Sequence, residues 1–348
     1  MTATKAYAAT AASIPLAPWK FERREVGAND VLFDILFCGV CHSDIHQVRD
    51  EWRNGIFPMV PGHEIVGKVS KVGSAVKKFK AGDLVGTGCM VDSCRECEHC
   101  KKGLEQYCSK GNSLTYNSLE QDKKTPTYGG YSDKIVVHED FVLSISDKLD
   151  LAAAAPLLCA GITTYSPLKH WKVSKGHKLA IVGLGGLGHM GVKFGVALGA
   201  EVTVLSTSPK KEKDAKALGA HKFVVTTDDA QLKGAMGSFD FILDTISAEH
   251  DMNTYLALLK TDGVYMCVGA PPKPYDVHAF SLIVQRKSLV GSMIGGIAET
   301  QEMLDFCAEK NIVCDIEMIN IQDVEQSYTR MMKGDVRYRF VIDMKSLK

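Results

Sequence analysis

The sequence has no excess of charge of either sign, because 41 lysines and arginines balance 41 aspartates and glutamates. A balanced charge provides no global field that draws a chain to nucleic acid or to an anionic membrane, so we expect neither partner. The chain also lacks an uninterrupted apolar run long enough to cross a bilayer. Its first residues, MTATKAYAATAAS, lack the hydrophobic core of a signal peptide, and we expect a cytoplasmic protein.

The remaining composition is that of an ordinary globular enzyme. Of 348 residues, 45% are hydrophobic and 24% are charged, and this length usually needs two domains. The chain has 11 cysteines, an odd number that would suit an oxidising compartment poorly. In a reducing cytosol, cysteines clustered at short spacing more often bind metal.

The pattern of expected secondary structure divides the chain into two parts. The first part holds short β-rich stretches broken by glycine and proline, which predict a compact, mostly β domain: 31–40, 64–73 and 83–88. After Pro156, strand candidates alternate with helical stretches, which predicts a parallel, doubly wound sheet. The strands are 178–183, 201–206, 222–227, 239–245 and 263–269, with 288–294 as an outer strand and helices at 186–199 and 210–219. The tail after 295 has two amphipathic helices and a strand, and we place it back on the first domain.

A glycine-rich loop follows the first strand of the second part. The stretch GLGGLG, Gly183 to Gly188, has the G-x-G-x-x-G spacing between an apolar strand and a helix. Gly183 permits the tight turn, Gly185 admits a pyrophosphate to the backbone, and Gly188 lets the helix pack on the strand. With Gly186 and Leu187 they predict a dinucleotide-binding loop, against the alternative of a purely structural turn.

The acid that usually binds the adenosine ribose is missing. Glu201 has the right separation from Gly183 but begins its strand, whereas the ribose-binding position is at the strand's carboxyl end. That end is STSPKK, which offers Ser206, Thr207, Ser208 and Lys211. Hydroxyl groups and a lysine can donate to a 2′-phosphate, so the stretch favours NADP(H). The alternative is a solvated loop capped by Ser208.

Four cysteines form the least ambiguous pattern of the chain. The segment CRECEHC and a later cysteine provide Cys94, Cys97, Cys100 and Cys108. Four thiolates at this spacing can close a tetrahedron around zinc, which leaves no position for a substrate and predicts a structural site. An iron–sulfur cluster is the alternative, and the fourth spacing together with Ser109 in place of a proline argues against it.

Three further candidates are dispersed: Cys41, His63 with its neighbour Glu64, and Cys159. Two sulfurs and one imidazole would leave a zinc position open for substrate. Spacing alone does not join these residues. Taken singly, Cys159 is read as a small buried hydrophobe and His63 as a histidine near a turn.

Together these motifs resemble the zinc-dependent medium-chain dehydrogenase/reductase superfamily, and within it the cinnamyl alcohol dehydrogenase-like branch. The residues that carry the resemblance run in order along nearly the whole chain: CGVCHSDIH, PMVPGHEIVG, CMVDSCRECEHCKKGLEQYC, PLLCAGITTY, GLGGLGHMG and DVRYRF. The resemblance joins Cys41, His63 and Cys159 into one catalytic zinc site. It implies an α/β protein with a GroES-like, mostly β catalytic domain (1–160 and 295–348) and a Rossmann NADP(H)-binding domain (161–294).

The resemblance also implies roles around the catalytic zinc, which would polarise an alcohol or aldehyde oxygen during hydride transfer. Ser43 and His46 match the family's proton-relay positions. Asp44 is expected to hold a ligand histidine, and Glu64 to bind zinc transiently. The alternatives are a helix cap for Ser43 and Asp44 and a surface position for His46.

For the cofactor, the resemblance implies contacts from both parts of the chain. His42 stands where many relatives have a pyrophosphate-binding arginine. Thr163 and the Val268-Gly269-Ala270 backbone are expected at the nicotinamide, and Arg337 at the pyrophosphate, with a plain surface charge as the alternative for Arg337.

We therefore expect a homodimeric alcohol dehydrogenase with two zinc ions per chain. It would use NADP(H) to reduce primary aldehydes, aromatic ones included. An alternative is an NAD-dependent alcohol, polyol or formaldehyde dehydrogenase. A non-catalytic zinc- or nucleotide-binding relative is the alternative from another class, and it would lack a catalytic ligand.

Overall fold

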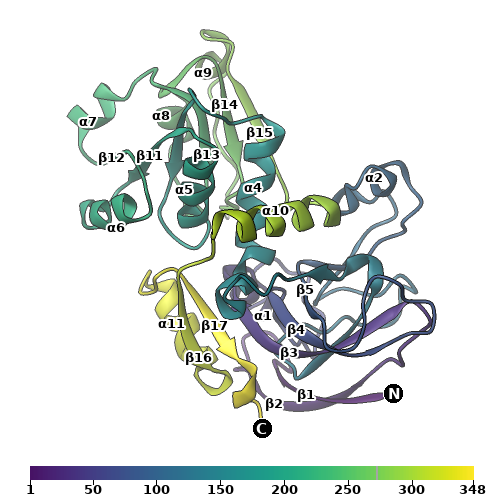
Figure 1. The fold of residues 1–348 in the computed structure, drawn as a ribbon. Helices are drawn as coiled ribbons and strands as arrows, with labels where there is room; N and C mark the ends of the chain where they lie inside the picture. Colours follow the sequence, from purple (N-terminus) through teal and green to yellow (C-terminus); the bar gives the residue numbers. More distant parts are fainter. Residues whose placement is uncertain (272) are drawn as a thin grey trace. The chain divides into compact units, whose positions relative to one another are not determined.

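The chain leaves its first structural unit after residue 162 and returns to it at residue 295 (Figure 1). The computed structural model describes residues 1–271 and 273–348. Unit 1 comprises Met1–Ile162 and Gly295–Lys348, and unit 2 comprises Thr163–Ile294.

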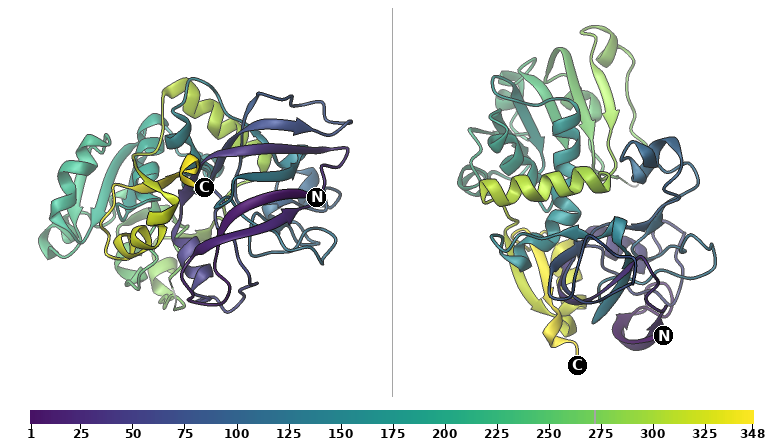
Figure 2. Two further views of the ribbon diagram at one scale, coloured as in Figure 1. Left: turned by 90° about the horizontal axis from the view of Figure 1, so that it is seen from below. Right: turned by 45° about the vertical axis from the view of Figure 1, so that its right-hand side comes forward.

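Unit 1 is built on a mixed, mainly antiparallel sheet. Its central path runs in the order β16 (Ile316–Asn320), β17 (Arg339–Asp343), β3 (Asp30–Val40), β4 (Ile65–Val72), β5 (Leu84–Thr87) and β9 (Leu143–Ser144), with β8 (Lys134–His138) also paired to β3. Two small antiparallel pairs accompany it: β1 (Thr2–Ala8) with β2 (Ala17–Arg23), drawn in purple in Figure 2, and β6 (Met90–Asp92) with β7 (Ser113–Leu114). Valine, isoleucine and phenylalanine fill β3 and β4, and their side chains are almost all buried.

The C-terminal tail completes this sheet. Strand β17, yellow in Figure 1, pairs antiparallel with the purple β3, and Phe340 lies opposite Val40. This register places Arg339 beside the residue that follows Val40, which is Cys41. The other helices of unit 1 are α1 (His42–Val48), α2 (Glu98–Lys101), α3 (Leu151–Ala154), α10 (Ile297–Lys310) and α11 (Val324–Met332).

Unit 2 is a parallel six-stranded sheet with helices between its strands. The order is β12 (Lys222–Val225), β11 (Glu201–Ser206), β10 (Lys178–Val182), β13 (Phe239–Asp244), β14 (Leu259–Cys267) and β15 (Ser288–Gly291). The order reverses between β10 and β13, as in a doubly wound sheet, and ligands bind such sheets at the carboxyl ends near that reversal. The predicted fold class is confirmed. The helices are α4 (Ala160–His170), α5 (Gly188–Ala197), α6 (Glu212–Ala217), α7 (Asp229–Gly234), α8 (Met252–Leu256) and α9 (Phe280–Ile283).

The central strands explain why unit 2 folds this way. Strands β10 and β13 are mostly apolar and largely buried, because both faces of a parallel sheet are covered. In the described part of the chain no single helix is long and apolar enough to span a membrane. The bent pair Leu151–Leu158 and Ala160–His170 meets that test by length and composition only.

Candidate functional site

Two thiols, an imidazole and a carboxylate meet in a buried cluster of unit 1. The ligand atoms of Cys41, His63, Glu64 and Cys159 all lie within 4.8 Å of one another. Cys41 follows β3, His63 and Glu64 precede β4, and Cys159 precedes α4, so the fold assembles the cluster from three distant segments. Two sulfurs and one nitrogen form the donor set of a zinc site that keeps a position for substrate.

The Glu64 carboxylate shows that a cation fits this cluster. The residue is fully buried, and neither of its oxygen atoms has a hydrogen-bond partner among the residues that the structure describes. Arg339 Nη2 lies 3.2 Å from Glu64 Oε1 and compensates part of the charge. Burial nevertheless raises the pKa of Glu64 to about 8, against the effect of Arg339. A divalent cation held by the neighbouring sulfurs and imidazole would stabilise the buried carboxylate further.

The two sulfurs also have the properties of metal ligands. A hydrogen bond between the thiols lowers the pKa of Cys41 well below its ordinary value and raises that of Cys159. This pattern describes two adjacent sulfurs that hold one proton between them. A bound zinc would replace that proton, because thiolates rather than thiols are its ligands.

Asp44 contacts the segments that carry Cys41 and His63. Its carboxylate accepts hydrogen bonds from the backbone N–H groups of Cys41, at 2.8 Å, and Gly62, at 3.1 Å. Its Oδ1 lies 3.3 Å from His63 Nδ1, which leaves the ring's Nε2 for a metal. Burial opposes the charged form of His63, but Cys89 and Asp44 raise the pKa of this histidine well above its ordinary value. Asp44 therefore ties the start of α1 to the segment before β4.

Two glycines make room for the cluster. A Cβ at Gly39 would lie 2.0 Å from Glu64 Oε2, so a larger residue there would displace the carboxylate. Gly62 has a φ of +100°, and a Cβ on it would lie 2.7 Å from Cys38 Sγ. The left-handed backbone conformation turns the chain so that His63 faces inward.

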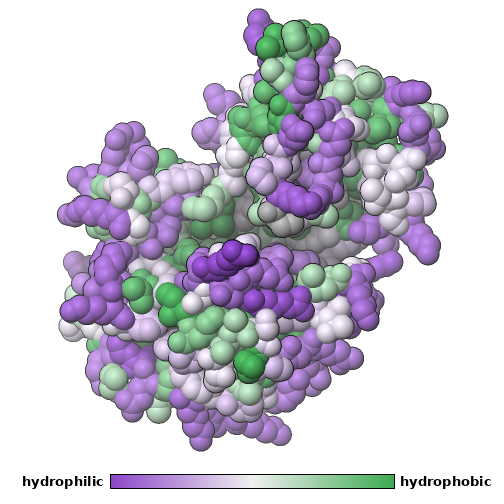
Figure 3. Space-filling model, turned by 180° about the vertical axis from the view of Figure 1, so that it is seen from behind, coloured by the Kyte–Doolittle hydropathy of each residue, from purple (hydrophilic) through white to green (hydrophobic). Residues whose placement is uncertain are grey.

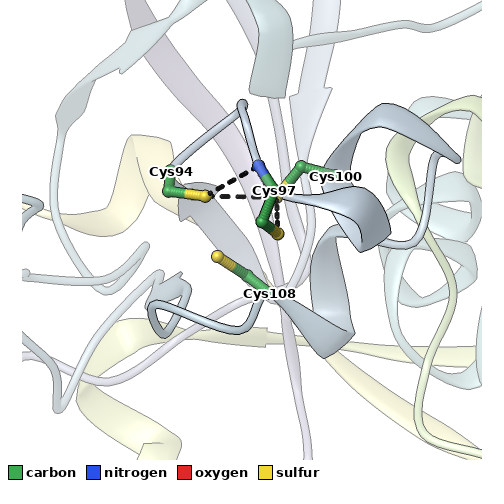
Figure 4. Close-up of side chains that lie close together, drawn as sticks. All are labelled: Cys94, Cys97, Cys100 and Cys108. Atoms are coloured by element: carbon green, nitrogen blue, oxygen red, sulfur yellow. Dashed lines mark hydrogen bonds between the residues drawn. The ribbon is translucent and has the colours of Figure 1, made fainter.

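The second cysteine set lies in one loop of unit 1 (Figure 4). The sulfurs of Cys94, Cys97, Cys100 and Cys108 point toward a common centre and lie within 4.8 Å of one another. Backbone N–H groups of Cys100 and Ser109 and the Ser109 side chain lower the pKa of Cys97 to about 5. Four sulfurs with no other ligand atom fit a closed tetrahedral zinc site.

The glycine loop lies at the carboxyl end of β10 in unit 2. Gly183 has a φ of +88°. A Cβ at Gly188 would lie 2.1 Å from Gly183 O, so the start of helix α5 packs directly against the backbone of the loop. A Cβ at Gly185 would meet no atom of the described residues 1–271 and 273–348 within 4 Å. Packing within the chain therefore requires Gly183 and Gly188, whereas the open space at Gly185 suits a ligand approaching the backbone.

The strand register separates Ser206 from Glu201. Val182 pairs with Leu205, which places Ser206 at the same sheet edge as Gly183, whereas Glu201 pairs with Lys178 at the opposite edge. Lys211 Nζ donates to Leu184 O at 2.9 Å, so this lysine reaches back to the glycine loop. Ser208 is half-buried beside it, and Thr207 is exposed.

The remaining predicted residues take up different environments. Ser43 Oγ accepts a hydrogen bond from Cys41 Sγ at 3.7 Å, and His46 Nδ1 lies 2.5 Å from Glu51 Oε2. His42 and Arg337 are exposed, and Thr163 is buried. Val268, Gly269 and Ala270 follow β14 at the carboxyl edge of the sheet.

Two residues at the cluster escaped the sequence analysis. Arg339 is buried against Glu64 and donates to Val40 O at 3.3 Å, whereas the sequence analysis had selected its neighbour Arg337. Strand β17 begins at Arg339, so strand alternation does not extend to the exposed Arg337, and the sequence pattern does not single out Arg339. Cys89 forms a hydrogen bond with Cys159 that lowers the pKa of Cys89. Nothing in the sequence distinguished this cysteine.

Comparisons of the sequence and of the structure with known proteins agree on one family. Residues 27–147 match the alcohol dehydrogenase GroES-like domain, and residues 186–309 match the zinc-binding dehydrogenase domain. The chain is 56% identical to NADP-dependent alcohol dehydrogenase C 1 of Mycolicibacterium smegmatis, over 100% of both chains. It is 54% identical to aldehyde reductase YahK of Escherichia coli, over 99% of both. The structure of a cinnamyl alcohol dehydrogenase from Sorghum bicolor matches with a TM-score of 0.97 and 46% identity, covering 100% of this chain and 99% of that one.

Proposed function

Because this chain belongs to the zinc-dependent medium-chain alcohol dehydrogenase family, in its cinnamyl alcohol dehydrogenase-like branch, we propose that it interconverts alcohols and aldehydes with NADP(H). The buried cluster of Cys41, His63 and Cys159 carries this conclusion, since a non-catalytic relative has no need of an open metal site. The substrates we assign are primary alcohols and aldehydes, aromatic ones included.

The two units divide the work between them. We assign unit 1 the role of the GroES-like catalytic domain, because it contains both metal-ligand clusters. We assign unit 2 the role of the Rossmann NADP(H)-binding domain, because it contains the glycine loop at the carboxyl edge of a parallel sheet.

Cys41, His63 and Cys159 would hold the catalytic zinc, and Glu64 is close enough to join them during ligand exchange. A zinc ion bound there supplies a Lewis acid that polarises the substrate oxygen. Asp44 orients His63 through Nδ1 and fixes Cys41 through its backbone N–H. The charge of Arg339 stabilises both Glu64 and the Cys41 thiolate. Cys94, Cys97, Cys100 and Cys108 would hold a second, structural zinc.

The first turn of α1 provides the proton path that we assign. The Ser43 hydroxyl lies beside Cys41, where it can exchange a proton with a substrate oxygen. His46 stands one turn further along the same helix and is held at Nδ1 by the half-exposed Glu51. Residues three apart on a helix share a face, so Ser43 and His46 can pass a proton toward solvent.

For the cofactor, we assign the pyrophosphate to the glycine loop and the 2′-phosphate to Ser206, Ser208 and Lys211. The carboxyl-edge position of these side chains supports the assignment, as does the contact of Lys211 with Leu184. Thr207 borders this phosphate site. His42 and Arg337 remain predicted pyrophosphate contacts. Thr163 and Val268–Ala270 remain the predicted nicotinamide contacts.

Steady-state kinetics with a panel of aldehydes and alcohols tests the function, with NADP(H) and NAD(H) compared in parallel. We expect kcat/KM to favour NADPH, and a preference for NADH would contradict the cofactor assignment. Ser206→Asp places a carboxylate beside the 2′-phosphate and should lower kcat/KM for NADPH by about a hundredfold. Glu201→Gln is the matched control, because its carboxylate lies at the other edge of the sheet and should leave cofactor preference unchanged.

A homodimer in the cytoplasm is the assembly and location we propose. Strand β15 is one outer strand of the unit 2 sheet. Phe280 and Ile283 of α9 and Val284, which caps this helix, are 64–74% exposed. Figure 3 shows hydrophobic side chains over the end of unit 2 that carries α9. Patches of this kind on a soluble protein often mark an interface. Light scattering should give a molar mass of two chains for the wild type. The Ile283→Lys variant should have a molar mass closer to that of a single chain.

A further inference from the structure

A buried carboxylate, an imidazole and a phenol meet at the carboxyl end of β13, in unit 2. Asp244 is the last residue of that strand and is fully buried. Its Oδ2 lies 3.0 Å from His250 Nε2 and accepts a hydrogen bond from the Tyr275 hydroxyl at 3.2 Å. None of the roles assigned above uses these three residues.

Both ring nitrogens of His250 face acceptors. Nε2 faces the Asp244 carboxylate, and Nδ1 lies 2.9 Å from Ala248 O. A neutral imidazole can donate from only one nitrogen, so only the doubly protonated ring donates to both acceptors at once. The hydrogen bond with Asp244 raises the pKa of His250, against the effect of burial, which agrees with the geometry.

The same aspartate holds two turns of the backbone together. Its Oδ1 accepts from Ile246 N at 3.0 Å, and its carbonyl oxygen accepts from the N–H groups of Val268 and Gly269, both at 3.0 Å. A Cβ at Gly269 would lie 2.1 Å from Ile246 O, so the two turns touch backbone to backbone. A movement of the 245–250 segment would therefore displace the 268–270 turn.

That segment also packs on the glycine loop. The Thr245 hydroxyl donates to Val182 O at 2.7 Å, and a Cβ at Gly183 would lie 3.1 Å from Ile246 Cγ1. The cluster and the segment attached to it thus contact both the 268–270 turn and the glycine loop, the two stretches of backbone that we assign to the cofactor.

We propose that Asp244, His250 and Tyr275 are positioning residues that hold the Val268–Ala270 turn against the glycine loop, so that NADP(H) affinity depends on the protonation of His250. This inference rests on the proposed cofactor site. It concerns residues to which we assign no contact with the substrate or the cofactor.

The sign of the pH dependence follows from the raised pKa. Protonated His250 can donate to both Asp244 and Ala248 O, and deprotonation removes the imidazole N–H from one of these two contacts. The support of the turn is therefore complete below the ordinary histidine pKa and is lost as pH rises through the raised one. The loosened turn must then be ordered by the cofactor, which lowers affinity.

The other titratable groups around the cluster do not change charge near neutral pH. Burial raises the pKa of Cys267 to about 12 and also raises those of Tyr255, Tyr265 and Tyr275. Hydrogen bonds from Thr254 and Asn253 lower the pKa of Asp251, which stays ionised. His250, whose pKa is raised by its hydrogen bond with Asp244, is thus the group of this cluster that loses its charge as pH rises above the ordinary histidine pKa.

Two measurements on the whole enzyme test the proposal. In the first, NADPH fluorescence gives the Kd from pH 7 to 9.5 for the wild type, His250→Gln and Asp244→Asn. The matched control is His177→Gln, whose ring lies in the turn before β10, at the opposite edge of the sheet. In the second, hydrogen–deuterium exchange of the cofactor-free enzyme follows residues 245–250 and 267–271, with rates corrected for intrinsic pH dependence.

We expect the wild type and His177→Gln to lose about five- to tenfold in NADPH affinity over this range. His250→Gln should bind weakly at pH 7 and change less than twofold, and its two segments should lose protection at every pH. A wild-type pH dependence that survives in both His250→Gln and Asp244→Asn would overturn the proposal. If the exchange pattern appears but NADPH does not bind, the positioning role stands and the proposed cofactor is wrong.

Discussion

The two cysteine clusters of unit 1 differ in where their sulfur ligands come from and in how deeply they are buried. Cys94, Cys97, Cys100 and Cys108 come from one loop, and most of them are partly exposed. Cys41 and Cys159 come from distant parts of the first segment of unit 1, and both are buried beside an imidazole and a carboxylate. The loop cluster has four protein sulfurs, whereas the buried cluster mixes donor types, and Glu64 there has no hydrogen bond within the described part of the chain.

This difference separates a site that stabilises from a site that reacts. A loop whose own ligands close the tetrahedron needs little from the rest of the fold, and its metal contributes folding energy. The buried cluster depends on β3, on the turn at Gly62 and on Asp44 to bring its members together. If the comparison holds, a change in one cluster should leave the metal of the other in place.

The largest effect is expected from Cys159→Ala. Loss of one thiolate should remove the catalytic zinc and lower kcat/KM by about a thousandfold or more, because the polarising metal is lost. Steady-state kinetics measures the effect. Cys307→Ala, which removes another buried cysteine of unit 1, should keep near-wild-type activity. Comparable activity in Cys159→Ala would exclude this cysteine as a ligand.

Cys97→Ser should act on stability rather than on chemistry. Loss of the loop metal should lower the free energy of unfolding by an amount on the order of 3–5 kcal/mol. Thermal unfolding in the presence of zinc measures the change, and activity per bound catalytic zinc should stay close to that of the wild type at low temperature. Lys102→Ala, an exposed change in the same loop, provides the control. An unchanged melting temperature would show that the loop needs no metal.

Asp44→Asn should have the smallest effect of the three, because it leaves every ligand in place. The neutral amide has one oxygen acceptor instead of two, so it cannot keep both backbone hydrogen bonds, and it has no charge with which to orient His63. The affinity for zinc should therefore fall about 10- to 100-fold. Competition with a coloured chelator measures the affinity of the buried site. Asp140→Asn, on the surface beside Lys78, should leave it unchanged. Equal affinities in the two variants would show that Asp44 does not support the site.

The sequence revealed the local features well. The C-x2-C-x2-C spacing and the glycine loop each lie within one short stretch, so their residue types and separations predict their geometry. The alternation of strand and helix candidates after Pro156 likewise predicted the parallel sheet.

The dispersed features needed either a family resemblance or the coordinates. Spacing alone left Cys41, His63 and Cys159 unconnected, because strand register and the turn at Gly62 bring them together. Arg339 was missed for the same reason, since only the pairing of β17 with β3 reveals its contact with Glu64. The Asp244–His250 pair was also invisible, because neither residue belongs to a motif.

Zinc content of purified protein tests the central claim most directly. Elemental analysis should give two zinc ions per chain for the wild type and one each for Cys159→Ala and Cys97→Ser. The remaining ion should support turnover only in Cys97→Ser. A wild-type chain with one zinc, or a single substitution that removes both ions, would contradict the account of two independent sites.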